Sequence, residues 1–300
     1  MEPDQGTSEA RQGGRGVTFS IARSIVVRGV AAIYLIAFLS WWVQCEGLTG
    51  AEGLAPLGSL MESAHEQIEP SKRWQFPTVY WLGTSDAFQY GVCALGVAVA
   101  LAVLAGFLPG PGLLALWALY LSVVTTGQAF MRFQWDGLLL ESGLLAAVWA
   151  PWMQWRLARD PRRDRPAAVS VQWLIRGLLF RLRFFSAAVK WASADPLWRT
   201  FRALTVHYET QPLPTWTAYW VHWLPEPAHV ASCVAMFTIE LGGAFLVFGP
   251  RLGRTAAFVG FLIPFVLWRA APILPSFPCL ALEQGQLTQV CAPGCGPPEQ

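Results

Sequence analysis

Residues 90–130, YGVCALGVAVALAVLAGFLPGPGLLALWALYLSVVTTGQAF, decide the fold of this chain. They contain two apolar runs, Tyr90–Leu108 and Leu113–Phe130, and each is close to the roughly 20 residues that a membrane-spanning helix needs. Only PGPG, residues 109–112, separates the two runs, and proline and glycine are the strongest breaks between helices. So short a connection predicts an antiparallel pair of membrane helices.

The composition of the whole chain agrees with a membrane protein. Of the 300 residues, 54% are hydrophobic and 13% are charged, and the mean hydropathy is +0.40. A typical soluble domain has roughly 45–50% apolar residues even when glycine is counted. We therefore expect the lipid bilayer to surround most of the chain, with membrane lipid as a partner. A formal net charge of +2 gives no strong global field, so no nucleic-acid partner is expected.

Five more apolar runs extend the pattern on both sides of the hairpin. The seven predicted spans are Ser24–Val43, Tyr90–Leu108, Leu113–Phe130, Gly137–Trp152, Val171–Lys190, Ala228–Phe248 and Leu252–Trp268. Arginines interrupt the fifth run, so hydropathy alone supports that span least. The predicted fold class is all-α: a polytopic integral membrane helical bundle of about seven transmembrane helices.

Three regions of the chain differ in composition. Residues 1–20 are polar and glycine-rich. Such a segment buries too little apolar area to offset the entropy of ordering, which predicts a disordered cytoplasmic N-terminus. Residues 21–268 hold all seven predicted spans and form the transmembrane helical domain. Residues 269–300 are rich in proline and have no helical or strand period, so we expect an irregular tail.

Arginines set the predicted orientation of the spans. Four arginines lie between residues 11 and 28, before or at the start of the first span, and five lie between residues 156 and 165. Basic loops stay on the cytoplasmic side of a membrane, and four crossings return the chain to the side from which it started. Both segments are therefore predicted to be cytoplasmic, together with the loop 250–254. Residues 44–89, the FQWD turn (133–136) and the segment around residue 210 then face the outside or an organelle lumen.

The fifth predicted span carries a row of cationic side chains. Arg176, Arg183 and Lys190 are spaced by seven residues, and positions seven apart drift by only about 20° around a helix. Charges at membrane depth are costly and face protein or water rather than lipid. Glu141 and Glu240 lie in apolar runs and are candidate partners. Two interpretations stay open: buried ion pairs that fix helix register, or a polar cavity open to the outside.

Two further polar segments are predicted on the outer side of the membrane. In MRFQWDGLLLES, residues 131–142, Asp136 is placed to cap the fourth span and to oppose its dipole. Glu141 lies deeper, where capping no longer explains it, and is the better functional candidate of the two.

The second outer segment is HYETQPLP, residues 207–214. Its two prolines predict a rigid, non-helical ledge. The polar side chains on this ledge are His207, Tyr208, Glu209 and Gln211. They form either a hydrogen-bonded structural network or, for His207 or Glu209, a general base placed against a substrate.

The chain lacks the local signatures of common enzyme and metal sites. It has no glycine-rich phosphate loop, GxSxG, HExxH or CxxC, and its six cysteines have no metal-ligand spacing. We expect no metal and no cofactor. Cys93 and Cys233 lie in apolar runs and are interpreted as buried small hydrophobic residues.

Three long motifs carry a family resemblance. They are FQWDGLLLESGLLAAVWAPW (133–152), RGLLFRLRFFSAAVKWASADPLWRTFRALTVHYETQPLP (176–214) and FTIELGGAFLVFGPR (237–251). In this order and at this spacing the chain resembles the lipase maturation factor family, from about residue 24 to residue 264. The resemblance implies a folding factor rather than an enzyme, with a lipase as its client protein. It implies an endoplasmic reticulum membrane in a eukaryote, or the inner (plasma) membrane in a bacterium.

Two alternatives accompany this interpretation. The segment RLRFFSAAVKWASADPLW (181–198) is similar to part of vitamin K-dependent gamma-carboxylase, and that similarity implies a membrane enzyme with Lys190 as its base. The second alternative rests on the tail. After Phe265 the further helix and the C-terminal domain of the family are not found, so the chain is interpreted as a truncated or frameshifted family member, in the extreme a non-functional one.

Overall fold

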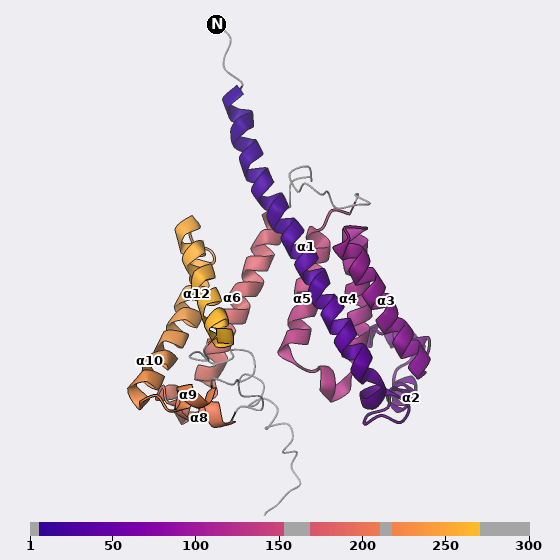
Figure 1. Ribbon diagram of the computed structural model, residues 1–300. Helices are drawn as coiled ribbons and strands as arrows, with labels where there is room; N and C mark the ends of the chain where they lie inside the picture. Colours follow the sequence, from indigo (N-terminus) through magenta and orange to yellow (C-terminus); the bar gives the residue numbers. More distant parts are fainter. Residues whose placement is uncertain (1–5, 153–168, 211–217, 271–300) are drawn as a thin grey trace, which may run out of the picture. The chain divides into compact units, whose positions relative to one another are not determined.

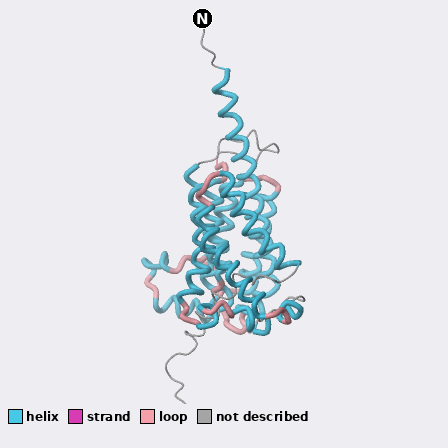
Figure 2. The backbone as a smooth tube through the Cα atoms, turned by 90° about the vertical axis from the view of Figure 1, so that its left-hand side faces the viewer, coloured by secondary structure: helices cyan, strands magenta, loops and turns pink. Residues whose placement is uncertain are grey.

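The computed structural model describes residues 6–152, 169–210 and 218–270, and these residues form helices and loops without a strand (Figures 1 and 2). The chain divides into two compact units, residues 1–173 and 174–300. The all-α prediction is therefore confirmed.

The first unit is built around four long helices. Its elements are α1 (Gly6–Thr49), α2 (Leu57–Gln67), η1 (Pro70–Gln75), η2 (Val79–Trp81), α3 (Asp86–Leu104), α4 (Pro109–Thr126), η3 (Gln128–Met131) and α5 (Gln134–Trp149). Helices α1, α3, α4 and α5 alternate in direction, so α1 starts at the end of the unit where α5 finishes (Figure 1). Residues 1–20 are predicted to be disordered, but α1 extends back to Gly6, and residues 1–5 lie outside the described residues.

The connection between α3 and α4 differs from the prediction. PGPG was expected to be the loop, yet α4 begins at Pro109, and the chain reverses over residues 105–108. Gly106 (φ 92°) and Leu108 (φ 43°) adopt the left-handed backbone that this reversal requires. Proline fits the first turn of a helix because the N–H it lacks would have no partner there. A Cβ at Gly112 would lie 2.4 Å from Cγ2 of Val103, so the glycine allows the two helices to pack closely.

Aromatic residues fill the core of the first unit. The ring centroid of Tyr120 lies 5.5 Å from that of Tyr34 and 5.7 Å from that of Phe38, both edge to face, a geometry that favours aromatic pairs. Helix α5 approaches this cluster at Gly143, where an added Cβ would be 2.0 Å from the hydroxyl of Tyr34. The three rings are almost fully buried and join α1 to α4.

The second unit combines longer helices with several short ones. Its elements are α6 (Val169–Ala192, which begins in the first unit), α7 (Pro196–Arg199), α8 (Ala203–Thr210), α9 (Ala218–His222), α10 (Glu226–Phe237), the π-helical turn η5 (Thr238–Gly242), α11 (Gly243–Leu246) and α12 (Arg251–Ala270). The core of this unit forms between α6, the short helices and α10, around residues such as Leu204, Met236 and Phe237.

Four helices of the described residues are long and apolar enough to cross a membrane: 21–49, 86–104, 109–126 and 226–246. Only 33% of the most apolar stretch of α3 is buried. Apolar side chains such as Ile36 and Val43 are 66% and 86% exposed, as expected where lipid is the solvent. All seven predicted spans coincide with helices, but α5 has only 16 residues and α6 is interrupted by arginines. The count of seven spans therefore stays a prediction.

The prediction of a non-helical ledge at HYETQPLP is wrong for its first half. His207, Tyr208 and Glu209 lie in α8, which continues to Thr210. A proline disfavours helical backbone at the residue before it, and that residue is Gln211. The helix can therefore run up to Thr210. Residues 211–217, including Gln211, lie outside the described residues.

Candidate functional site

A buried ion pair in the second unit joins α6 to the π-helical turn η5. Nζ of Lys190, near the end of α6, is 3.0 Å from Oε2 of Glu240, and their side chains are 2% and 0% exposed. Removing two charges from water costs several kcal/mol for each ion, and attraction offsets this cost only with good geometry and further hydrogen bonds. The surroundings of the pair provide such bonds.

Neighbouring side chains surround both charged groups. Nζ of Lys190 donates a hydrogen bond to Oγ of Ser186 at 3.2 Å, and that hydroxyl donates to Oε1 of Glu240 at 3.3 Å. Nζ also lies 3.9 Å from Sδ of Met236 and 5.7 Å from the ring centroid of Trp198. We call Lys190, Glu240 and Ser186 the buried triad. Each member bonds the other two, which fixes the position of the ammonium group.

Local backbone structure brings the triad together. Ser186 precedes Lys190 by four residues on α6, and residues four apart share a helix face. Glu240 lies in η5, a π-helical turn between α10 and α11. Such turns are rare and frequently mark functional sites. The sequence predicts Lys190 and Glu240 as site residues but not Ser186, although the i, i+4 spacing of Ser186 and Lys190 is a usable signal.

A histidine and a tyrosine of α8 extend this polar region. His207 is 4% exposed and Tyr208 is 5% exposed. Their ring centroids are 5.5 Å apart, and the ring of Tyr208 lies 5.8 Å from that of His229 on α10. Nε2 of His229 is 3.3 Å from the carbonyl oxygen of His222. His229 is also almost fully buried, and it is not among the site residues predicted from the sequence.

The ionisation of His207 depends on this environment. Burial, followed by the positive charge of Lys190, lowers the pKa of His207 to about 4. Burial also raises the pKa of Tyr208 to about 12. Both rings are therefore neutral near pH 7, and neither brings a second charge close to the ion pair.

The other cations of the predicted stripe lie on the same side of α6. Arg183 and Arg176 line a cavity together with residues of α12, and the guanidinium of Arg183 lies 4.8 Å from the ring centroid of Phe261. The triad matches the interpretation of a buried ion pair, since Lys190 and Glu240 are closed off from solvent.

In the first unit, Asp136 forms a separate polar contact. It lies in the first turn of α5, is 4% exposed, and accepts a 2.6 Å hydrogen bond from the hydroxyl of Tyr120. Its Oδ2 is buried without a hydrogen-bond partner among the described residues. Glu141, on the same helix, is exposed. The geometry thus makes Asp136, rather than Glu141, the buried carboxylate of α5.

The comparisons with known proteins agree on one family. The family model for the lipase maturation factor transmembrane domain matches residues 21–271. Human lipase maturation factor 2 is 40% identical over 258 residues, which cover 79% of this chain and 35% of the human protein. Mouse lipase maturation factor 1 is 32% identical over 245 residues, which cover 79% of this chain and 42% of the mouse protein. No solved structure matches the chain.

These matches bear on the alternatives drawn from the sequence. They give no support to the carboxylase or to a non-functional product. The aligned part spans about a third of human lipase maturation factor 2 and less than half of mouse lipase maturation factor 1. The match to the family model, over residues 21–271, includes the triad, α8 and the first turn of α5. From the extent of the family match and the identity to these relatives, this chain belongs to the lipase maturation factor family.

Proposed function

We propose that this chain acts in the membrane of the endoplasmic reticulum to assist the folding and assembly of a lipase client, without changing any covalent bond of that client. The observation that carries the proposal is the 40% identity to human lipase maturation factor 2 over 258 residues. The client contacts the lumenal end of the bundle, where the predicted orientation places α8 and the start of α5.

In this proposal the triad supports the helices that present the client-facing surface. Lys190 is enclosed by Glu240, Ser186 and Met236 and is 2% exposed. A lysine base requires access to a substrate proton, whereas a structural ammonium requires enclosure by partners. The enclosure favours a structural role for Lys190.

The test measures secreted lipase activity per unit of lipase protein in cells that lack the endogenous gene. Wild-type chain should raise this specific activity while lipase synthesis stays unchanged. No increase at matched expression of the chain would overturn the proposal.

A double variant separates a structural lysine from a catalytic one. Lys190→Met combined with Glu240→Met replaces a buried ion pair by apolar side chains, an exchange that folded proteins often tolerate. The double variant should retain most of the rescue. Loss of rescue by a variant that is expressed and folded would instead make the ammonium group essential to the reaction or contact.

A further inference from the structure

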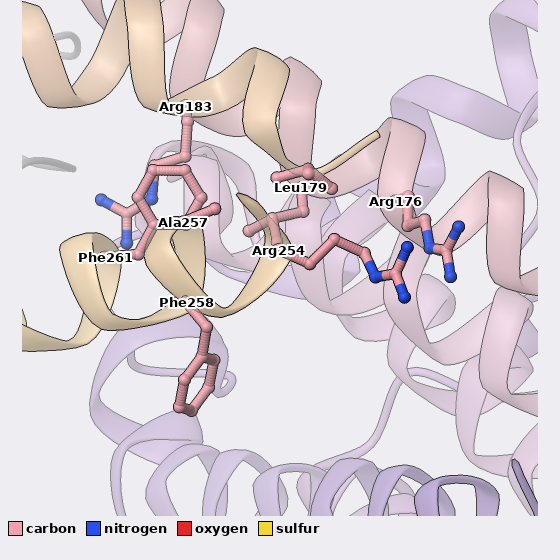
Figure 3. A pocket seen from close by; sticks show the side chains of 8 residues that line it. Arg176, Leu179, Arg183, Arg254, Ala257, Phe258 and Phe261 are labelled. Carbon is pink, nitrogen blue, oxygen red and sulfur yellow. The ribbon is translucent and has the colours of Figure 1, made fainter. Parts of the chain in front are cut away.

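A cavity of about 440 Å³ lies between α6 and α12 in the second unit (Figure 3). This volume is within the range of about 300–1,000 Å³ that is typical of small-molecule sites. Arg176 and Arg183 line it from α6, and Arg254 lines it from α12. The lining of the cavity is mostly apolar, and these arginines contribute its charge. Arginine suits an anion because its guanidinium group matches the geometry of phosphate oxygens.

The charged side chains that line the cavity are all cationic. None of its eight lining residues, all in the described part of the chain, carries a carboxylate. Arg254 uses one N–H to bond the carbonyl oxygen of Gly249 at 2.9 Å, and a guanidinium has five donors. In Figure 3, Arg254 extends toward Arg176, while Arg183 lies apart from them beside Phe261. Arg176 and Arg254 therefore form a cationic end of the cavity.

The remaining lining is apolar and partly open. Phe258 is 64% exposed and Leu179 is 37% exposed, whereas Ala257 and Phe261 are buried. A soluble anion gains nothing from such a surface, but an acyl chain does, at about 0.8 kcal/mol for each buried CH₂. The arginines at one end of the cavity and the apolar wall beside them together match an amphiphile with an anionic headgroup.

The position of the cavity along the helices fits a lipid of one leaflet. Arg176 lies in the second turn of α6 and Arg254 in the first turn of α12, and both helices start at the same end of this unit (Figure 1). Arg183 is seven residues further along α6, about 10.5 Å deeper at 1.5 Å per residue. The predicted orientation makes this the cytoplasmic end, and basic pockets between membrane helices on that side bind anionic headgroups.

We propose that this cavity binds an anionic phospholipid. Arg176 and Arg254 hold its phosphate, and one of its two acyl chains lies on Leu179 and Phe258. Arg183, placed over the ring of Phe261, closes the deeper end. The other acyl chain extends into the bilayer, because the cavity is smaller than a whole phospholipid.

The experiment uses the full chain in nanodiscs that contain equal amounts of phosphatidylserine and phosphatidylcholine. Native mass spectrometry then measures which lipid stays bound to the protein after the protein is released from the nanodiscs. Wild-type chain should retain phosphatidylserine at least tenfold over phosphatidylcholine, and soluble glycerophosphoserine should not compete at equal concentration. Equal retention of the two lipids, or full competition by the soluble headgroup, would overturn the proposal.

Variants locate the site. Arg176→Gln with Arg254→Gln should lower phosphatidylserine retention at least tenfold. Arg181→Gln is the matched control, since Arg181 is exposed on the same helix and does not line the cavity; it should leave retention unchanged. Phe258→Ser tests the apolar wall of the cavity at an exposed position. It should lower phosphatidylserine retention, and it keeps the proposal testable if the Arg176→Gln, Arg254→Gln variant fails to fold. Wild-type retention in Phe258→Ser, or an equal loss in Arg181→Gln, would contradict the assignment.

Discussion

The buried triad makes a prediction about single side chains. Lys190→Met removes the partner of a carboxylate that is 0% exposed, and stranding a buried charge costs about 3–5 kcal/mol. We expect the variant to unfold at clearly lower denaturant concentration in mixed detergent micelles. Adding Glu240→Met should restore most of the stability that Lys190→Met loses.

The surface pair Lys72–Glu69 provides the control for this experiment. Their charged atoms are 3.2 Å apart, close to the distance in the buried pair, but the side chains are 56% and 68% exposed. Lys72→Met should therefore change stability little, because exposed ion pairs contribute little. A similar loss in both lysine variants would show that burial of Glu240 is not the cause.

His207 predicts a pH dependence. Its pKa is lowered to about 4 in the folded chain, while an unfolded histidine titrates near 6.5. Between these values the unfolded state binds the proton and the folded state does not. Stability contributed by this residue is therefore constant above about pH 6.5 and falls as the pH drops toward 4, by up to about 3 kcal/mol.

The measurement is the difference in thermal midpoint between wild type and His207→Gln across pH 4 to 7.5. The wild type should lose more stability than the variant as the pH falls. His65→Gln serves as the control because His65 is exposed. An identical pH profile for wild type and His207→Gln would refute a neutral, buried His207.

At the scale of helices, alanine substitutions at two glycines of α5 are predicted to have opposite effects on stability. A Cβ at Gly143 would lie 2.0 Å from the hydroxyl of Tyr34, whereas a Cβ at Gly137 meets nothing within 4 Å. Gly143→Ala should destabilise the chain by about 1–3 kcal/mol through overpacking. Gly137→Ala should be neutral or stabilising by up to about 1 kcal/mol, because alanine favours helix. Unfolding in detergent micelles measures both, and equal effects would rule out a close contact of α1 with α5.

The helices also show what the sequence could predict and what it could not. Continuous apolar runs located seven long helical segments in the part of the chain that the structure describes, since lipid-facing helices need no alternating pattern. Their ends were harder to predict: α4 accepts PGPG in its first turn, and α8 continues to Thr210 despite the prolines that follow. These boundaries depend on tolerance of proline at specific positions, which composition does not reveal.

The candidate site was predicted in part for a similar reason. Lys190 and Glu240 were identifiable because charges stand out in apolar runs. His229 and Tyr120 were missed because neutral polar residues are common in helices and gain their role from a partner distant in sequence. Ser186 has one partner four residues away, Lys190, but its second partner, Glu240, is 54 residues away. The contact of Asp136 with Tyr120, 16 residues away, is of this kind.

At the scale of the whole molecule, the arginine distribution predicts a topology that glycosylation tests directly. The chain contains no asparagine, so it has no N-glycosylation acceptor of its own and gives no background signal. Gln5→Asn creates an acceptor in the N-terminal segment, and Glu66→Asn with Ile68→Thr creates one at the end of α2, in the segment that connects α1 to α3. After expression with endoplasmic reticulum membranes, the loop variant should gain one glycan, seen as an endoglycosidase-sensitive mass shift, and Gln5→Asn should gain none. The reverse result would mean that the predicted orientation of the helices is inverted. The arginine-lined end of the second unit would then face the lumen.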